Sequence, residues 1–123
     1  MAAARWFPAS ARDHGQLGQL MIKHIVMWRV RGDTTAERSA AARTVQRAFE
    51  SLRDRIPGMR QLEIGIDVSD CDYACDVVLY SEFESQAALA AYAVHPEHQR
   101  VRDELGDLRI TRHQVDYVME AKG

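Results

Sequence analysis

Cysteine is scarce in this 123-residue sequence, which has only two. Cys71 and Cys75 are spaced C-x3-C with no His or further Cys nearby, so they do not make a zinc site. A calcium loop over residues 70–76 is also disfavoured, because Ala74 stands where an oxygen ligand is needed. We therefore predict two free thiols in a reducing cytoplasm, a polar hairpin loop at this place, and no bound metal.

Charge of one sign is nowhere concentrated, and long hydrophobic runs are absent. The 16 basic and 18 acidic residues are mixed along the chain, with a formal net charge of −2. No block of like charge predicts a nucleic-acid partner. The apolar stretches are strand-sized, far below the roughly 20 residues that span a bilayer. The first twenty residues lack the apolar core of a secretory signal, so neither a membrane partner nor export is expected.

The length and composition fit one globular domain, with 46% hydrophobic and 28% charged residues. Strong patterning begins at Met21. We therefore predict a flexible N-terminal extension over residues 1–20 and a domain over residues 21–120. A docking role for Trp6 and Phe7 is the alternative for the extension. Because so small a domain leaves much of its surface exposed, association would add burial.

The segment from Met21 to Val30 alternates two sets of side chains, which predicts a strand. His24, Val26 and Trp28 lie on one face, and Ile25 and Met27 on the other. Both faces carry large apolar groups, so both should be covered, one by helices and the other by a second sheet. This pattern is the first indication of a homodimer formed through the sheet face.

A helix is predicted after this strand. Thr34 and Glu37 have the spacing of a capping box, so the helix should begin there. Apolar residues at spacings of four, three and four indicate one face packed on the sheet. They are Val45, Phe49, Leu52 and Ile56. Pro57 and Gly58 predict the end of the helix, because proline lacks an amide donor and glycine accepts a left-handed turn.

The second half of the chain adds three strands and two helices. In order, we predict strands over 61–68 and 77–83, helices over 86–94 and 97–105, and a strand over 109–119. The first two strands should pair as a hairpin. Ser85 caps the first of these helices, and His95 with Pro96 breaks it. The order β-α-β-β-α-α-β predicts an α+β, ferredoxin-like fold.

Three motifs in this order resemble the Dabb family, the stress-responsive A/B barrel domains. They are M-I-K-H-I-V from Met21, the segments D-V-V-L and S-E-F-E-S within residues 76–85, and Y-A-V-H-P-E-H from Tyr92. The similarity covers about residues 21–119. It implies a dimeric α+β barrel, in which two four-stranded sheets pack face to face and helices cover the outside.

The resemblance implies where a functional site would lie, but it is compatible with more than one activity. Family members include stress-associated proteins and, in plants, a polyketide cyclase that closes a ring by aldol condensation without metal or cofactor. Its catalytic Tyr and His match Tyr92 and His98. A histidine can take and return a proton near neutral pH, and a tyrosine hydroxyl can donate to a developing enolate oxygen. We therefore predict a cofactor-free, cyclase-like enzyme for a small aromatic or ketide-like ligand.

Five further residues are predicted to contact the substrate. They are His24, Val26, Trp28, Phe49 and His95. The first three match positions that line the cavity of the cyclase, and Phe49 would add an apolar wall. For His95 a local hydrogen bond at the helix break is the alternative, and ordinary core packing is the alternative for the others.

Two departures from the plant cyclase keep other functions open. Val77 stands where the cyclase has a histidine, and bulky aromatic positions of its first helix are mostly Ala and Arg here. A non-catalytic stress-response or ligand-binding dimer, with Tyr92 and His98 in structural roles, is the main alternative. Other dimeric α+β barrels oxidise aromatic substrates or bind haem, but this sequence has no haem or flavin motif.

Overall fold

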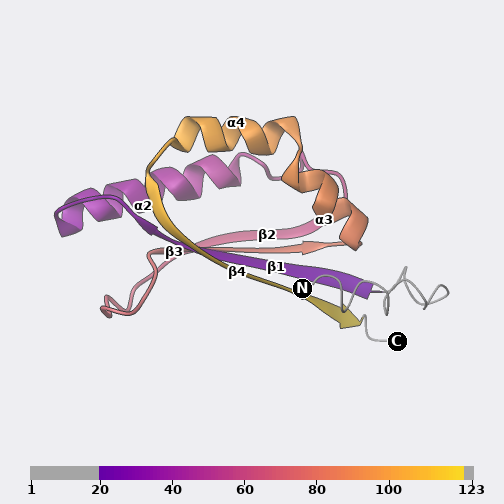
Figure 1. The fold of residues 1–123 in the computed structure, drawn as a ribbon, viewed down its shortest axis with the longest axis horizontal. Coiled ribbons are helices and arrows are strands. Elements are labelled where there is room, and N and C mark those ends of the chain that lie inside the picture. Colours follow the sequence, from indigo (N-terminus) through magenta and orange to yellow (C-terminus); the bar gives the residue numbers. More distant parts are fainter. Residues whose placement is uncertain (1–19, 121–123) are drawn as a thin grey trace.

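The computed structural model describes residues 20–120, which form seven elements (Figure 1). They are β1 (Leu20–Val30), α2 (Thr35–Glu50), β2 (Met59–Ile66), β3 (Val77–Phe83), α3 (Gln86–Ala93), α4 (Pro96–Leu105) and β4 (Arg109–Glu120). This is the predicted order β-α-β-β-α-α-β. The extension expected over residues 1–20 lies outside the described residues, except for Leu20, which opens β1.

The four strands form one sheet in the order β2-β3-β1-β4, and neighbouring strands are antiparallel. Helices α2, α3 and α4 all lie on one face of this sheet, so the molecule has two layers (Figure 1). The predicted α+β, ferredoxin-like fold is therefore confirmed. The long strands β1 and β4 run side by side at one edge, where Val26 pairs with Gln114 and His24 with Asp116.

The hydrophobic core lies between the helices and the sheet. Along β1 the alternation is as predicted, because Ile22, His24, Val26, Trp28 and Val30 are all buried. Val45 and Phe49 of α2 are completely or almost completely buried against this face. Each such apolar side chain contributes about 1.5–3 kcal/mol through burial, so the shared core is what holds α2 on the sheet.

Helix α2 begins as predicted but ends earlier. The Thr34 hydroxyl accepts from the Glu37 amide at 3.1 Å, and the Glu37 carboxylate accepts from the Thr34 amide at 3.3 Å, which completes the capping box. The expected end at Pro57 is wrong, because the α-helix stops at Glu50. Residues 51–55 form tighter turns, in which the Leu52 amide donates to the Phe49 carbonyl three residues back.

The stripe expected on α2 is nevertheless buried as a whole. Leu52 and Ile56 are 0% and 6% exposed, although they lie in the turns and not on the helix. Asp54 has a φ of 65°, a left-handed conformation that interrupts any continuation of the helix. Burial thus fixes the position of these two side chains, while the backbone between them leaves helical geometry.

Strands β2 and β3 pair as the predicted hairpin. In the loop between them, the Asp67 carboxylate accepts from the Asp70 amide at 2.9 Å, and the Asp76 carboxylate accepts from the Val30 amide at 2.8 Å. Cys71 and Cys75 are free thiols. The acidic residues of the loop therefore satisfy backbone donors and tie the hairpin to β1.

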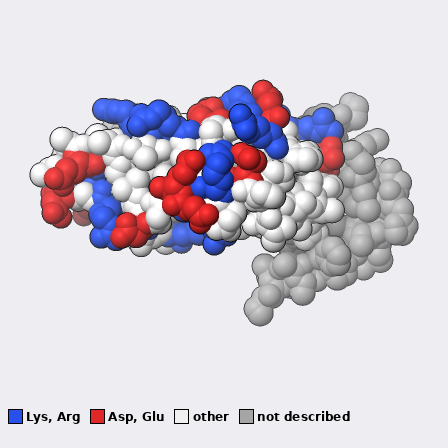
Figure 2. All heavy atoms as spheres, turned by 90° about the horizontal axis from the view of Figure 1, so that it is seen from above, with Lys and Arg blue, Asp and Glu red and all other residues white. Residues whose placement is uncertain are grey.

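The sheet face opposite the helices is rich in apolar side chains. Ile25 pairs there with Tyr80 on one side and Val115 on the other. In a single chain Met27, Val115 and Tyr117 are 37%, 50% and 43% exposed. The surface seen from above the helices is different, because basic and acidic groups are interspersed over it (Figure 2). Within residues 20–120 no helix has the length and apolar character that crossing a bilayer requires.

Candidate functional site

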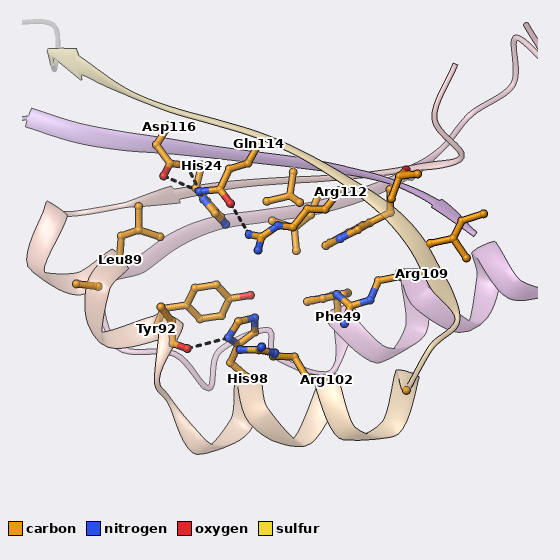
Figure 3. Close-up of a pocket in the computed structure, with 18 residues that line it drawn as sticks. His24, Phe49, Leu89, Tyr92, His98, Arg102, Arg109, Arg112, Gln114 and Asp116 are labelled. Atoms are coloured by element: carbon orange, nitrogen blue, oxygen red, sulfur yellow. Dashed lines mark hydrogen bonds and ion pairs between the residues drawn. The ribbon is translucent and has the colours of Figure 1, made fainter. Parts of the chain in front are cut away.

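A cavity of about 640 Å³ lies between helices α3 and α4 and the β1–β4 side of the sheet (Figure 3). Six of the seven site residues predicted from the sequence line it. They are His24, Val26, Trp28, Phe49, Tyr92 and His98. The tertiary structure therefore brings together residues from β1, α2, α3 and α4 around one space, while the seventh residue, His95, lies outside its lining.

Tyr92 and His98 are in contact inside this cavity. Their ring centroids are 4.4 Å apart, at an interplanar angle of 34°. Tyr92 comes from the end of α3 and is 3% exposed, whereas His98 comes from the first turn of α4 and is half-buried. The break between α3 and α4 at Pro96 redirects the chain, so two side chains six positions apart can point into the same space.

The protonation state of His98 follows from its contacts. Its Nδ1 lies 3.3 Å from the Ala93 carbonyl, and since a carbonyl can only accept, Nδ1 carries the proton. The lone pair is then on Nε2. Burial lowers the pKa of His98, and the positive charges of Arg102, Arg109 and Arg112 lower it further. The ring is therefore neutral at neutral pH and can accept a proton.

Tyr92 can act as a hydrogen-bond donor, in contrast to His98, which can accept a proton. Burial raises the pKa of its hydroxyl well above the ordinary value, so the phenol keeps its proton at any physiological pH. Within residues 20–119 no hydrogen bond contributes to this pKa. Among residues 20–119 the hydroxyl is therefore a donor without an acceptor, on the wall of a cavity.

His24 faces the same cavity from the sheet and is held by a residue that the sequence reading missed. His24 Nδ1 and Asp116 Oδ1 are 2.6 Å apart, and the ring is 6% exposed. Burial alone would raise the pKa of the Asp116 carboxyl. The hydrogen bond and charge of His24, donation from Gln114 and the charge of Arg112 outweigh burial and keep this pKa below its ordinary value.

The alternation of side chains along β4 could have identified Asp116 as a residue of the cavity. The sequence reading used Val115, Tyr117 and Met119 to predict the strand, and these residues belong to the outer face. The intervening positions Arg112, Gln114 and Asp116 line the cavity. Polar residues at every second position of this strand alternate with apolar residues. That alternation could have indicated that the polar face lines a pocket.

Trp28 and Phe49 form an apolar wall. Their rings are stacked, with centroids 4.9 Å apart and an interplanar angle of 17°. The Arg109 guanidinium lies over both rings, 5.2 Å from the centroid of Trp28 and 5.5 Å from that of Phe49. Val26 is only 2% exposed, so it contributes to the floor of the cavity.

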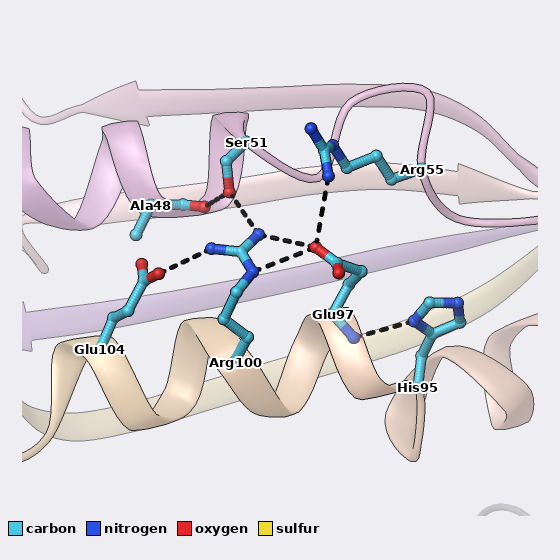
Figure 4. A network of polar contacts seen from close by, with 7 residues as sticks. All are labelled: Ala48, Ser51, Arg55, His95, Glu97, Arg100 and Glu104. Atoms are coloured by element: carbon cyan, nitrogen blue, oxygen red, sulfur yellow. Dashed lines mark hydrogen bonds and ion pairs between the residues drawn. The ribbon is translucent and has the colours of Figure 1, made fainter.

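Helix α4, which carries His98, is stabilised by an N-cap and by polar contacts with the segment that follows α2 (Figure 4). His95 is its N-cap residue, and its Nδ1 accepts from the Glu97 amide at 3.0 Å. This is the local hydrogen bond given above as the alternative for His95. Arg100 donates to Ser51 at 3.0 Å, just after α2, and to Glu97 at 2.8 Å. The Arg100–Ser51 hydrogen bond and the 3.8 Å ion pair of Arg55 with Glu97 cross to the α2 side, hold α4 there and so set the position of His98.

The fold and the cavity define a ferredoxin-like α+β protein with a pocket between its helices and its sheet. The chain belongs to the family of stress-responsive A/B barrel (Dabb) domains, whose model matches residues 22–119. The resemblance identified in the sequence is thereby confirmed. A comparison with curated proteins found no match.

Solved structures support the fold. A dimeric protein of unknown function from Bacteroides fragilis is 31% identical, with a TM-score of 0.70 over 80% of this chain and 96% of that one. A dimeric ferredoxin-like protein from Thermobifida fusca is 20% identical, with a TM-score of 0.69 over 81% and 92% of the two chains. A hydroxynitrile lyase from Passiflora edulis is 16% identical, with a TM-score of 0.66 over 84% and 96%.

Proposed function

We propose that this protein is a cofactor-independent, polyketide cyclase-like enzyme that catalyses aldol-type proton transfer on a small aromatic or ketide-like substrate. The observation that carries the proposal is the Tyr92–His98 pair, with rings 4.4 Å apart on the wall of one cavity. One member is a neutral base, and the other is a protonated donor that has no acceptor in the part of the chain that the structure describes. These are the two groups that enolisation of a carbonyl compound requires.

In the proposed reaction, His98 Nε2 removes a proton from the carbon next to a substrate carbonyl. The electron pair of that C–H bond forms an enolate, whose oxygen accepts a hydrogen bond from the Tyr92 hydroxyl. The enolate carbon then attacks a second carbonyl of the same molecule, which closes the ring. The alkoxide formed in this step takes the proton back from the His98 imidazolium, so the base is regenerated.

The remaining residues of the cavity bind and orient the substrate in this proposal. Trp28, Phe49 and Val26 supply apolar contact for an aromatic or acyl body. The ring of His24, held by Asp116, and the ring of Tyr92 form a T-shaped pair, with centroids 6.1 Å apart. His24 is therefore placed to contact a second oxygen of a substrate that reaches Tyr92.

We further infer that two copies associate through the outer face of the sheet. The supporting observation is the exposure of Met27, Val115 and Tyr117 on a face that also carries Ile25. The Bacteroides fragilis protein, 31% identical over most of this chain, is described as dimeric. A cytoplasmic location is part of the proposal and is supported by the two free thiols, Cys71 and Cys75, which a reducing compartment keeps reduced.

The test uses a synthetic triketide thioester and follows both ring closure and deuterium exchange next to the carbonyls by NMR. Tyr92→Phe and His98→Gln are each expected to lower turnover about 100-fold or more, because each removes one proton-transfer group. Tyr73→Phe is the matched control, since Tyr73 is 84% exposed in the hairpin loop. Circular dichroism and thermal unfolding establish that all three variants fold.

If the wild-type protein binds the probe but neither closes the ring nor exchanges deuterium, the enzymatic proposal is wrong. The same conclusion holds if both site variants turn over as fast as Tyr73→Phe. In either case the non-catalytic, ligand-binding dimer becomes the better account. The observation that favours this second candidate is the contact of Tyr92 with Phe83 at 5.3 Å, which is ordinary core packing.

A further inference from the structure

We propose that the cavity binds an anionic ligand, a carboxylate joined to an aromatic or acyl body, and that Arg102, Arg109 and Arg112 form its anion subsite. The inference deepens the proposed function, on which it rests for the identity of the site, by naming the substrate class. Arg102 comes from α4, and Arg109 and Arg112 come from β4. All three line the cavity that holds Tyr92 and His98 (Figure 3).

The three guanidiniums have no carboxylate partner among the described residues. None of the ion pairs found within residues 20–119 includes Arg102, Arg109 or Arg112. Asp116 is the carboxylate in the described lining of the cavity, and its Oδ1 is bonded to His24 at 2.6 Å. Arg112 acts on Asp116 through its charge, while its guanidinium donates to the neutral side-chain oxygen of Gln114. Three positive charges therefore face one negative charge.

Several arginines outside the cavity are paired with carboxylates. Arg100 contacts Glu97 at 2.8 Å and Glu104 at 2.7 Å, and Arg53 contacts Glu50 at 2.8 Å. On the outer surface, basic and acidic groups are interspersed (Figure 2). The cavity is thus a local concentration of positive charge in a chain whose formal net charge is −2. Such a concentration in a hollow attracts an anion from solution.

Arg109 gives the strongest single reason for a bound anion. It is half-buried, and its guanidinium lies over the rings of Trp28 and Phe49 at 5.2 and 5.5 Å. Burial lowers its pKa, and the neighbouring charges of Arg112 and Arg102 lower it further. A charge removed from water among like charges is unfavourable until a counter-charge arrives. A ligand carboxylate in the cavity would supply that counter-charge.

The chemistry of the walls narrows the class of anion. A planar guanidinium can bind a carboxylate through two parallel hydrogen bonds, which fixes its orientation. Beside the arginines lie the stacked rings of Trp28 and Phe49 and the aliphatic side chain of Leu89. A cavity of about 640 Å³ has the size of a small-molecule site. An inorganic anion would leave these apolar walls in water, whereas an aromatic or acyl carboxylate would cover them.

The test compares two probes of the same shape, 2-naphthoate and the neutral 2-naphthamide, by calorimetry on the full chain. We expect naphthoate to bind about tenfold or more tightly than naphthamide, because only the acid forms charge-assisted hydrogen bonds. Its affinity should fall with added salt, while that of the amide should not. The Trp28 indole resonance should shift with either probe, which locates binding in the cavity.

Variants assign the effect to the subsite. Arg109→Gln is expected to weaken naphthoate binding about tenfold or more and to leave naphthamide binding almost unchanged. Arg112→Gln, at an exposed position, gives a second reading if Arg109→Gln does not fold. Arg47→Gln is the matched control, because it removes the same charge from the exposed side of α2, outside the cavity.

The inference is overturned if the acid and the amide bind equally, if neither binds, or if Arg47→Gln weakens naphthoate binding as much as Arg109→Gln does. It is also overturned if inorganic phosphate competes with naphthoate at equal concentration, because the apolar walls would then not contribute. The wild-type protein separates the two proposals. If it binds naphthoate more tightly than naphthamide but shows no triketide turnover, the enzymatic proposal fails and the anion subsite stands.

Discussion

His24 and Asp116 are 92 positions apart in the sequence, yet Nδ1 of the histidine lies 2.6 Å from Oδ1 of the aspartate across strands β1 and β4. A second histidine of the cavity, His98, also directs Nδ1 at an oxygen, the carbonyl of Ala93. Each ring is therefore oriented by a fixed acceptor. In both rings this leaves Nε2 as the nitrogen available to a ligand.

Removal of the Asp116 carboxylate should destabilise the protein. In Asp116→Ala the Nδ1–H of His24 loses its acceptor while the ring stays buried, which costs about 1–3 kcal/mol of unfolding free energy at pH 7. Urea denaturation measures this loss. Asp107→Ala is the control, because the Asp107 side chain is 89% exposed and lies 3.6 Å from Arg31, so the loss should stay below about 0.5 kcal/mol.

The pH dependence of this effect has a defined sign. Since the pKa of Asp116 is lower in the folded state, the carboxylate stabilises the fold above its unfolded pKa of about 3.9. That stabilisation is lost as pH falls through the lower folded pKa. The difference in unfolding free energy between the wild type and Asp116→Ala should therefore become smaller in acid. A difference that grows would contradict a stabilising role for the Asp116 carboxylate.

His98 should titrate below the ordinary imidazole pKa of about 6.5, because burial disfavours the imidazolium. Activity that depends on its neutral form should then fall only below that pH. Arg112→Gln removes a positive charge that lowers this pKa, so the pKa should move upward. Imidazole NMR titration reads both values directly. Arg47→Gln should leave them unchanged, and an equal shift in that control would rule out a local cause.

The position of His95 predicts a purely structural effect. His95→Ala removes the N-cap acceptor of α4 and should cost about 0.5–2 kcal/mol. His95→Asn keeps a capping side chain and should be as stable as the wild type. Thermal unfolding measures both, and naphthoate affinity should be the same in both. A loss of affinity in His95→Asn would return this residue to the binding site.

Two glycines offer a matched comparison. Gly58 has a φ of 82°, and a Cβ there would lie 2.6 Å from the Cβ of Ala88. Gly106 has a φ of 53° but nothing within 4 Å of such a Cβ. Both alanine variants are strained by the positive φ, at a cost of about 1–3 kcal/mol each. Gly58→Ala should add about 1–3 kcal/mol of overpacking, and chemical denaturation that found equal losses would contradict this reading.

Association through the sheet can be tested with one charge. Val115→Glu places a carboxylate on the apolar outer face, opposite Ile25, and should shift a micromolar sample from dimer toward monomer. Val94→Glu is the control, since Val94 is 82% exposed between α3 and α4. Sedimentation velocity distinguishes the two. A wild-type protein that sediments as a stable monomer would refute the dimer.

Much of the fold could be predicted because its signals are local. The alternation around His24 and Trp28 predicted β1, and the Thr34–Glu37 spacing predicted the start of α2. Proline at position 96 predicted the break between α3 and α4. Each of these depends on side chains within one turn or two strand residues of each other, so tertiary contacts were not needed to recognise them.

The end of α2 was not predictable in the same way. Leu52 continues the apolar stripe, and burial of its side chain stabilises the protein equally whether the backbone is a helix or a turn. The left-handed Asp54 and the tight turns after Glu50 depend on how the chain reaches β2. Periodicity alone therefore placed the end of the helix too late.

The alternating strands, the helix starts and the Tyr92–His98 motif could be recognised from the amino-acid order alone, because hydrophobic period, capping and proline act over a few residues. The contact of Asp116 with His24, and the three arginines that face the same cavity as that motif, arise when distant parts of the chain come together. The antiparallel register of β1 with β4 makes these contacts, and such a register depends on burial across the whole sheet.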